Sequence, residues 1–297
     1  MSRGRRAKFS RALPLARWFA PLAVVAAAFA PALPPAARVA HSQSAQKSGI
    51  ADNVEIVALT HDNTLVRFNA ASPGVVSSTP ITGASGTLVG IDVRPADARL
   101  YALSDGYDLY VIDAATGKAK SASTLTAPFD GGTHSGFDFN PQADRLRLVA
   151  ENGQNLRVHV DLGAAATDGA LTYAPKDANA GTRPRLAAAA YTRSIAGAAT
   201  TQLFNIDAGT DVLVLQDPPN DGVLRTIGSL GVDFDSESGF DILSGPGESE
   251  RAFAATGSVL YRVDLATGAA VALGTIGDGT LRLVGLAVLP KPFAAGN

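Results

Sequence analysis

A repeat of 46 residues constrains this chain more than any other feature of its sequence. Residues 136–149 read GFDFNPQADRLRLV, and residues 90–103 read GIDVRPADARLYAL. The two stretches align without gaps, and their identical positions are Gly90/Gly136, Asp92/Asp138, Pro95/Pro141, Arg99/Arg145 and Leu100/Leu146. Further copies begin at Gly239 and Gly285, again 46 residues apart. Repeats of about 40 to 50 residues with several short strands each are typical of a β-propeller.

Short apolar runs between Gly, Asp, Asn and Pro turns predict four strands, a to d, in each repeat, and almost no helix. We expect the strands of blade two at 88–93, 99–104, 108–113 and 118–125, and those of blade three at 135–139, 145–150, 155–160 and 170–173. Those of blade four are expected at 186–192, 201–206, 211–216 and 223–228, and those of blade five at 239–243, 251–256, 258–264 and 269–276.

The two ends of the repeat region complement each other. Blade one begins near Val54 with strand b and has no strand a, whereas residues 283–290 form a strand a with no blade after it. Pairing of these ends would close the ring and remove exposed sheet edges. The predicted fold class is therefore all-β, a propeller of five four-stranded blades closed by the C-terminal strand pairing into the N-terminal blade. Six blades are the alternative if one loop contains further strands.

The first 40 residues predict an export signal. Residues 1–17 contain six Lys or Arg and no acid, an apolar run follows at 18–30, and Pro- and Ala-rich sequence continues to about residue 40. This order is typical of a signal peptide. A membrane anchor is the alternative, but the apolar run contains Pro21 and is shorter than the roughly 20 residues of a spanning helix. We expect an export signal at 1–40, a flexible lead-in at 41–53, one propeller domain at 54–290 and a tail at 291–297.

Composition agrees with an exported protein, periplasmic or extracellular, without stable membrane insertion after signal cleavage. Removing residues 1–40 takes away seven of the 25 basic residues and none of the 27 acidic ones, which leaves a net charge of about −9. Such a charge argues against nucleic acid or anionic lipid as a partner. The chain has no Cys, which excludes disulfides and thiolate metal sites. We expect no cofactor.

The repeated residues have structural interpretations first. The repeated glycines are expected to allow a tight turn into the innermost strand, and the prolines to end it. Asp92, Asp138 and Asp241 recur at one position of strand a and are expected to accept hydrogen bonds from neighbouring loops between blades. The functional alternative is a carboxylate cluster that holds a cation, with Asp138 a weak calcium candidate. Blade one has Ala287 at this position, so a symmetric metal ring is not expected.

Blade three differs most from the other repeats. Arg147 and Arg157 stand where the motifs place Tyr101 and Tyr110 of blade two. A buried guanidinium needs partners, and Asp138, Asp144 and Asp177 are internal acids that could form a salt-bridge network. The alternative is a pocket for an anion or a sugar, because arginine and amide side chains present planar hydrogen-bond donors. The candidate ligand-binding residues are Asn140, Arg145, Arg147, Asn155 and Arg157.

In this region the chain resembles the bacterial domain-of-unknown-function 4394 family. The resemblance rests on residues 136–149 and on an ordered series of motifs, which are GQNLR at 153–157, DGAL at 168–171, DANAG at 177–181, AAYT at 189–192, PPN at 218–220 and IGSLG at 227–231. It covers roughly residues 54 to 289 and implies an exported, propeller-like protein. It implies no activity and no catalytic residues.

Two functions follow as hypotheses. We favour a non-enzymatic binding or interaction module whose ligand is a small anion, a carbohydrate or an exported protein, because fold alone indicates no chemistry. The alternative is a propeller-type glycoside hydrolase with Asp92, Asp138 and Asp241 as its carboxylates. The sequence has no HExxH zinc motif and no Gly-x-Ser-x-Gly elbow. Aromatic residues, which sugar-processing clefts use for stacking, make up only 6% of the chain. Enzymatic activity is therefore the less favoured interpretation.

Overall fold

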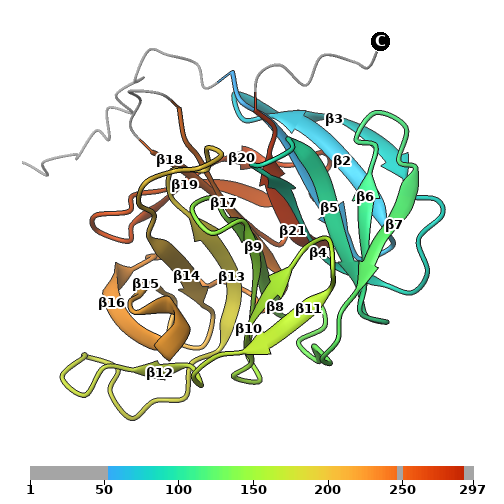
Figure 1. The fold of residues 1–297 in the computed structure, drawn as a ribbon. Helices are drawn as coiled ribbons and strands as arrows, with labels where there is room; N and C mark the ends of the chain where they lie inside the picture. Colours follow the sequence, from blue (N-terminus) through green and yellow to red (C-terminus); the bar gives the residue numbers. More distant parts are fainter. Residues whose placement is uncertain (1–52, 246–249, 291–297) are drawn as a thin grey trace, which may run out of the picture. The chain divides into compact units, whose positions relative to one another are not determined.

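The described strands are arranged as a ring of five antiparallel sheets, the blades of a five-bladed β-propeller (Figure 1). The structure is a computed structural model that describes residues 53–245 and 250–290. The chain divides into two compact units, residues 1–47 and 48–297, and every described residue belongs to the second. The predicted signal, most of the lead-in and the tail therefore lie outside the described residues. The predicted all-β propeller with five blades is confirmed.

Blade one combines the two ends of the repeat region. Its strands, from the axis outward, are β21 (Leu283–Val288), β1 (Glu55–Thr60), β2 (Thr64–Asn69) and β3 (Ser72–Pro80). The C-terminal strand β21 pairs antiparallel with β1, with Ile56 opposite Val288. In Figure 1 the red β21 accordingly lies beside the blue and cyan strands of the N-terminal blade. The predicted closure of the ring is present.

The other blades follow in chain order, each with its first strand next to the axis. Blade two contains β4 (Leu88–Arg94), β5 (Arg99–Ser104), β6 (Asp108–Ile112) and β7 (Ala119–Thr124). Blade three contains β8 (Ser135–Asn140), β9 (Arg145–Ala150), β10 (Asn155–His159) and β11 (Ala164–Thr167). Blade four contains β13 (Leu186–Tyr191), β14 (Leu203–Asp207), β15 (Val212–Gln216) and β16 (Val223–Ser229). Blade five contains β17 (Ser238–Leu243), β18 (Arg251–Thr256), β19 (Val259–Val263) and β20 (Ala270–Thr275).

One predicted strand is wrong. The outer strand of blade three is β11, not residues 170–173, where a short strand β12 (Thr172–Tyr173) instead pairs parallel with β16 and extends blade four to five strands. Backbone bonds from Gly169 to Asn220 and from Thr172 to Gly222 hold this segment against blade four. The strand β11 reads AAAT, so Thr167 is its single β-branched residue and it has no aromatic residue to indicate a strand.

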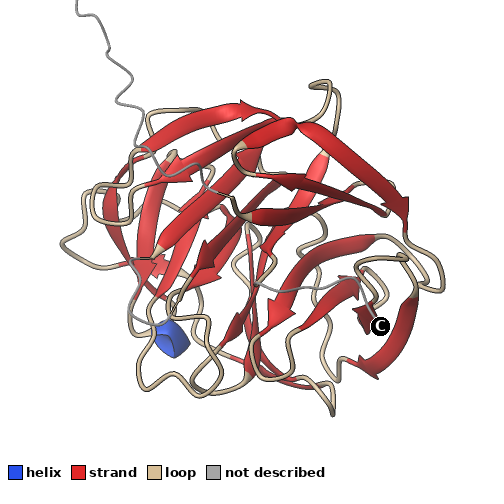
Figure 2. Ribbon diagram, turned by 90° about the horizontal axis from the view of Figure 1, so that it is seen from above, coloured by secondary structure: helices blue, strands red, loops and turns tan. Residues whose placement is uncertain are grey.

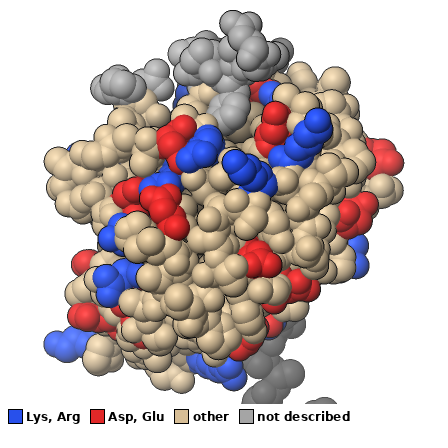
Figure 3. Space-filling view, turned by 45° about the vertical axis from the view of Figure 1, so that its right-hand side comes forward, with Lys and Arg blue, Asp and Glu red and all other residues tan. Residues whose placement is uncertain are grey.

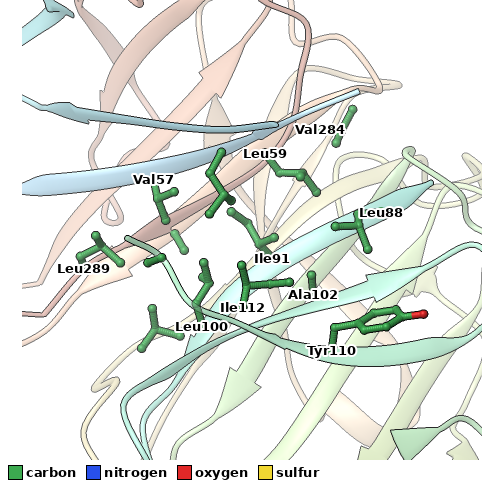
Figure 4. Packing of buried hydrophobic residues seen from close by; sticks show 14 residues of the cluster. Val57, Leu59, Leu88, Ile91, Leu100, Ala102, Tyr110, Ile112, Val284 and Leu289 are labelled. Carbon is green, nitrogen blue, oxygen red and sulfur yellow. The ribbon is translucent and has the colours of Figure 1, made fainter. Parts of the chain in front are cut away.

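Each gap between neighbouring blades contains a hydrophobic cluster. Figure 4 shows the cluster between blades one and two, where Leu59 and Val57 of β1 pack near Ile91 of β4 and Leu100 of β5. Comparable clusters fill the other four junctions. The innermost strands are almost wholly buried, whereas the outer strands β7, β11 and β20 are mostly exposed. The core therefore consists of five layers around the axis rather than one central mass.

The repeated glycines serve close strand packing rather than a tight turn. A Cβ atom on Gly136 would lie 2.5 Å from Cβ of Ala189 in the next blade, and one on Gly90 would lie 2.6 Å from Cβ of Phe137. Neither glycine has a positive φ. The prediction that these glycines allow a tight turn is therefore wrong. Glycine is required because neighbouring inner strands meet at these positions and leave no space for a side chain.

The described residues contain one helical turn, the three-residue 3₁₀ helix η1 (Pro219–Asp221), drawn blue in Figure 2. Within residues 53–245 and 250–290 there is no helix with the length and apolar character that crossing a membrane requires. On the face drawn in Figure 3, acidic and basic side chains lie in small mixed groups.

Candidate functional site

The repeat places three carboxyl groups at the propeller axis. Asp92, Asp138 and Asp241 occupy the same position of the inner strands β4, β8 and β17, and all three are buried. One carboxylate oxygen from each lies within 4.8 Å of the others. We call these three residues the carboxyl triad.

Each member of the carboxyl triad joins its own blade to the next one. The acceptor is a carboxylate oxygen, and the donor is the backbone N–H one residue past the equivalent position of the next inner strand. The three pairs are Asp92 with Phe139 (3.0 Å), Asp138 with Tyr191 (3.2 Å) and Asp241 with Val288 (2.6 Å). The expected hydrogen bonding between blades is thus present in the structure, but the donors lie in strands and not in loops.

Two blades lack the aspartate, and this accounts for two further hydrogen bonds of the triad. Blades one and four have Ala287 and Ala190 at this position and offer no acceptor to the strand that follows. The backbone N–H groups left over belong to Val93 and Ile242, and each donates at 2.6 Å to the second oxygen of the aspartate that precedes it. All five N–H groups are thereby satisfied, as buried backbone donors require. One oxygen of the triad, Oδ2 of Asp138, accepts no hydrogen bond from a described residue.

Burial and mutual repulsion make these carboxyls weak acids. Burial, followed by the charge of Asp241, raises the pKa of Asp92 well above its usual value. Burial, followed by the charges of Asp92 and Asp241, does the same to the pKa of Asp138. Burial raises the pKa of Asp241 to about 6, against the opposing effect of its two backbone hydrogen bonds. Like charges this close disfavour full ionisation, so the triad favours a proton or another positive charge among its oxygens.

A cavity of about 540 Å³ opens onto this triad where the inner strands of blades one, two and five end. Asp92 and Asp241 line the cavity, while Asp138 does not. Its walls are largely apolar and include Val93, Ile242 and Leu289. We call it the axial cavity. At the other end of the inner strands, around Gly90 and Gly136, the space is only about 10 Å³.

The carboxyl triad can also supply oxygen ligands to a hard cation such as calcium. Two of the five blades carry alanine in place of the aspartate, so the ligand set is incomplete on one side of the axis. Asp138 keeps one oxygen without a hydrogen bond, which makes it the member best able to bind an ion. The calcium assignment of Asp138 stays a prediction.

The blade-three arginine that sequence reasoning singled out is buried in a polar network. Arg147 donates from Nη1 to Asp168 and Asn155, each at 2.7 Å, and from Nη2 to Asn220 at 2.7 Å. Its Nε donates to the hydroxyl of Tyr191 at 3.2 Å. The guanidinium therefore connects blade three to the loop that contains η1, between β15 and β16 of blade four.

Two further candidate residues belong to the same network. The Asn155 amide donates to the backbone oxygens of Gly169 and Pro219, and it is buried. Arg157 donates from Nε to both oxygens of Asp168, and its side chain is 41% exposed. Arg157 lies opposite Arg147 across β9 and β10. It therefore takes the place of Val111 and not that of Tyr110, because strand c follows the same 46-residue offset as the rest of the blade.

The remaining two candidates lie apart from this network, at the turn between β8 and β9. Asn140 accepts hydrogen bonds from the backbone of Gln142 and Ala143, which fixes the turn. Arg145 donates to the backbone oxygens of Ala143 and Asp144. The ligand-binding assignment of Asn140, Arg145, Arg147, Asn155 and Arg157 stays a prediction, and the structure brings only the last three together.

Sequence reasoning missed the acid that pairs with these arginines. The partner is Asp168, whereas Asp144 pairs with Arg94 and Asp177 accepts from Thr226. The motifs at 168–171 and 218–220 contain Asp168 and Asn220, and their recurrence in the resembled family was the available signal. Sequence reasoning also missed the axial cavity, because its lining combines the ends of the inner strands of three blades with a loop of blade four, and their meeting depends on tertiary packing.

The sequence of residues 64–287 matches the family described as Domain of unknown function (DUF4394). No curated protein matches the chain.

Several solved structures are similar to this chain at low identity. A protein of unknown function from Bacteroides thetaiotaomicron has 16% identity and a TM-score of 0.47 over 80% of this chain and 64% of that one, so the chain spans less than two thirds of that protein. One from Bacteroides caccae has 9% identity and a TM-score of 0.39 over 74% and 72% of the two chains. Catalytically inactive virginiamycin B lyase from Staphylococcus aureus with quinupristin has 11% identity and a TM-score of 0.38 over 75% and 71%.

Proposed function

The chain belongs to the DUF4394 family, and we propose that it is an exported, non-enzymatic binding module that takes a small molecule into the axial cavity. The observation that carries this proposal is the cavity of about 540 Å³ with two buried carboxyl groups in its lining. Small-molecule sites are typically concave, mostly apolar and about 300 to 1,000 Å³ in volume, with a few polar groups that orient the ligand. The axial cavity has these properties.

The hydrogen bonds of the carboxyl triad favour binding over hydrolysis. Glycoside hydrolysis needs one carboxyl that delivers a proton and a second that attacks the sugar or activates water. Of the triad only Asp92 and Asp241 line the cavity, and both oxygens of each already accept a backbone N–H. These bonds fix the carboxyls as parts of the ring, which suits them to orient a ligand and leaves neither free to move as an attacking group.

Export is the second part of the proposal. It is supported by the basic, apolar and small-residue order of residues 1–40. A chain without disulfides must hold its fold by burial, and the five clusters between the blades supply that burial.

Ligand-dependent thermal unfolding of the full chain tests the proposed function. The panel contains hexoses, amino sugars, amines, carboxylates, phosphate and calcium, each at several millimolar. A ligand at 100 times its dissociation constant adds about 2.7 kcal/mol to the free energy of unfolding. The Ala196→Trp variant places an indole in the axial cavity and should abolish the shift, because Ala196 lines it.

The matched control is Leu162→Trp, since Leu162 is 67% exposed on blade three and does not line the cavity. This variant should keep the shift of the unaltered chain. A shift that survives in Ala196→Trp, or a chain that responds to no compound in the panel, would reject the axial cavity as the binding site.

A further inference from the structure

The ionisable groups at the floor of the axial cavity are all carboxyl groups. Asp92 and Asp241 line the cavity, and Asp138 lies behind them within 4.8 Å. The other charged lining residues are Glu55, which is paired with Arg67, and Arg251, which has an interaction partner of its own. A ligand that enters therefore meets two carboxyl groups that have no basic partner among the described residues at the floor, and charged groups with partners elsewhere.

A carboxylate oxygen without a hydrogen bond lies behind this floor, outside the lining of the cavity. Asp138 is only 1% exposed, and its Oδ2 receives no hydrogen bond from any residue in the described part of the chain. Oxygen atoms of Asp92 and Asp241 that already accept one N–H each still have a second lone pair. The floor of the cavity thus keeps acceptor capacity for a ligand.

The apolar walls of the cavity indicate that the rest of the ligand is apolar. Val93, Ile242, Leu243, Val288 and Leu289 all contribute to the lining. A metal ion alone would leave most of a 540 Å³ cavity and its apolar wall unused. A carboxylate or phosphate would place like charge next to the floor, which costs free energy in a buried site.

From this geometry we propose that the ligand of the axial cavity is a small organic ammonium, with its charged nitrogen at Asp92 and Asp241 and an apolar body against the wall. The inference rests on the proposed function and names its ligand class. Charge-assisted hydrogen bonds to buried carboxylates are stronger than neutral ones, so the ammonium gains more here than a hydroxyl of the same size.

Isothermal titration calorimetry of the full chain at pH 7 with three isosteric probes tests the ligand class. The probes are cyclohexylamine, cyclohexanol and cyclohexanecarboxylate, with glucose and calcium chloride as further arms. We expect cyclohexylammonium to bind about tenfold or more tightly than cyclohexanol, and the carboxylate to bind most weakly. Acidification to pH 4 should weaken the ammonium, because protons then compete for the same oxygens.

Variants locate the site within the cavity. Asp241→Asn should weaken cyclohexylammonium about tenfold, while Asp278→Asn, on an exposed turn away from the cavity, should not change its affinity. Should Asp241→Asn fail to fold, the order of the three probes on the unaltered chain still decides the ligand class.

The outcomes separate the two proposals. Equal or tighter binding of cyclohexanol or glucose, or calcium bound in preference to the amine, would overturn the ammonium while leaving a binding module in place. If no probe binds and no compound of the wider panel shifts the unfolding temperature, the proposed function fails together with this inference.

Discussion

Asp92, Asp138 and Asp241 each hold two blades together, and the same burial that makes this possible raises their pKa values. The backbone N–H groups at the crowded axis need acceptors on a short side chain. The aspartate carboxyl group is short and has two oxygens, so one residue can accept from two N–H groups. The unfavourable effect is electrostatic, because three carboxyls within 4.8 Å cannot all be charged without repulsion.

The raised pKa of Asp241 predicts how stability depends on pH. Folding raises this pKa from 3.8 to about 6, so between these pH values the folded protein holds a proton that the unfolded chain releases. The stabilisation is complete below about pH 4 and is lost as the pH rises through 6. We expect Asp241 alone to lower the free energy of unfolding by about 2 kcal/mol between pH 4 and pH 7. Urea unfolding at each pH unit measures this change.

Neighbouring groups act in known directions over this range. The raised pKa values of Asp92 and Asp138 have the same sign as that of Asp241, whereas the lowered pKa of Asp144, caused by its hydrogen bond from Arg94, acts below the range. Asp241→Asn should make the pH dependence shallower. A free energy of unfolding that rises from pH 4 to pH 7 would contradict the buried, proton-sharing triad.

At the scale of single elements, the inner strands are defined by how closely they approach one another. β8 reaches β13 where Gly136 faces Ala189, and β17 reaches β21 where Gly239 faces Leu286. The inner strands converge toward the axis, so there is no space for a Cβ atom at Gly136 or Gly239. The close approach is also what brings each aspartate within hydrogen-bond distance of the next strand.

Gly136→Ala should therefore destabilise the protein by at least 1 to 3 kcal/mol, because a methyl group 2.5 Å from Cβ of Ala189 forces two strands apart. Urea unfolding measures the difference in free energy. Gly106→Ala is the matched control, since its Cβ would approach nothing nearer than 3.6 Å and its φ is not positive. Equal stability of the two variants would show that the inner strands can move apart to accommodate a methyl group without loss of stability.

At the scale of the whole molecule, five blades share five junctions, and the ring is complete only when β21 joins β1. The junction between blades three and four contains a buried polar network of Arg147, Asp168 and Asn155 beside its hydrophobic cluster. Such networks are costly when one member is missing, so this junction depends on precise pairing more than on burial.

Ring closure predicts the outcome of two rearrangements of the chain. Ending the protein after Leu281 removes β21 and leaves β1 and its neighbours with an open edge, so we expect aggregation or loss of cooperative unfolding. A circular permutant that carries residues 282–290 in front of Val54 restores the same pairing and should fold. Size-exclusion chromatography and thermal unfolding by circular dichroism compare the two proteins. A stable monomer without β21 would show that closure is dispensable.

Repetition explains why so much of the fold could be predicted and where prediction failed. Positions that recur every 46 residues, such as Asp92 and Asp138, identify equivalent strands without any knowledge of packing. Residues 170–173 do not recur, and they joined the edge of blade four instead of blade three. The predicted partner acids Asp138 and Asp144 lie close to Arg147 in the sequence, whereas the actual partner Asp168 directly follows the outer strand β11.

The sequence by itself determined the all-β class, the five blades and the closing strand, because each of these depends on periodic positions that local chemistry makes equivalent. Only the tertiary structure decided which groups share the axis. Alanine at 190 and 287 breaks the symmetry of the triad, so Asp92 and Asp241 each accept two backbone hydrogen bonds while Asp138 keeps one unbonded oxygen. The wall of the axial cavity combines inner-strand ends of blades one, two and five with a loop of blade four, so its volume and its acidic floor depend on how these blades meet and not on any one of them.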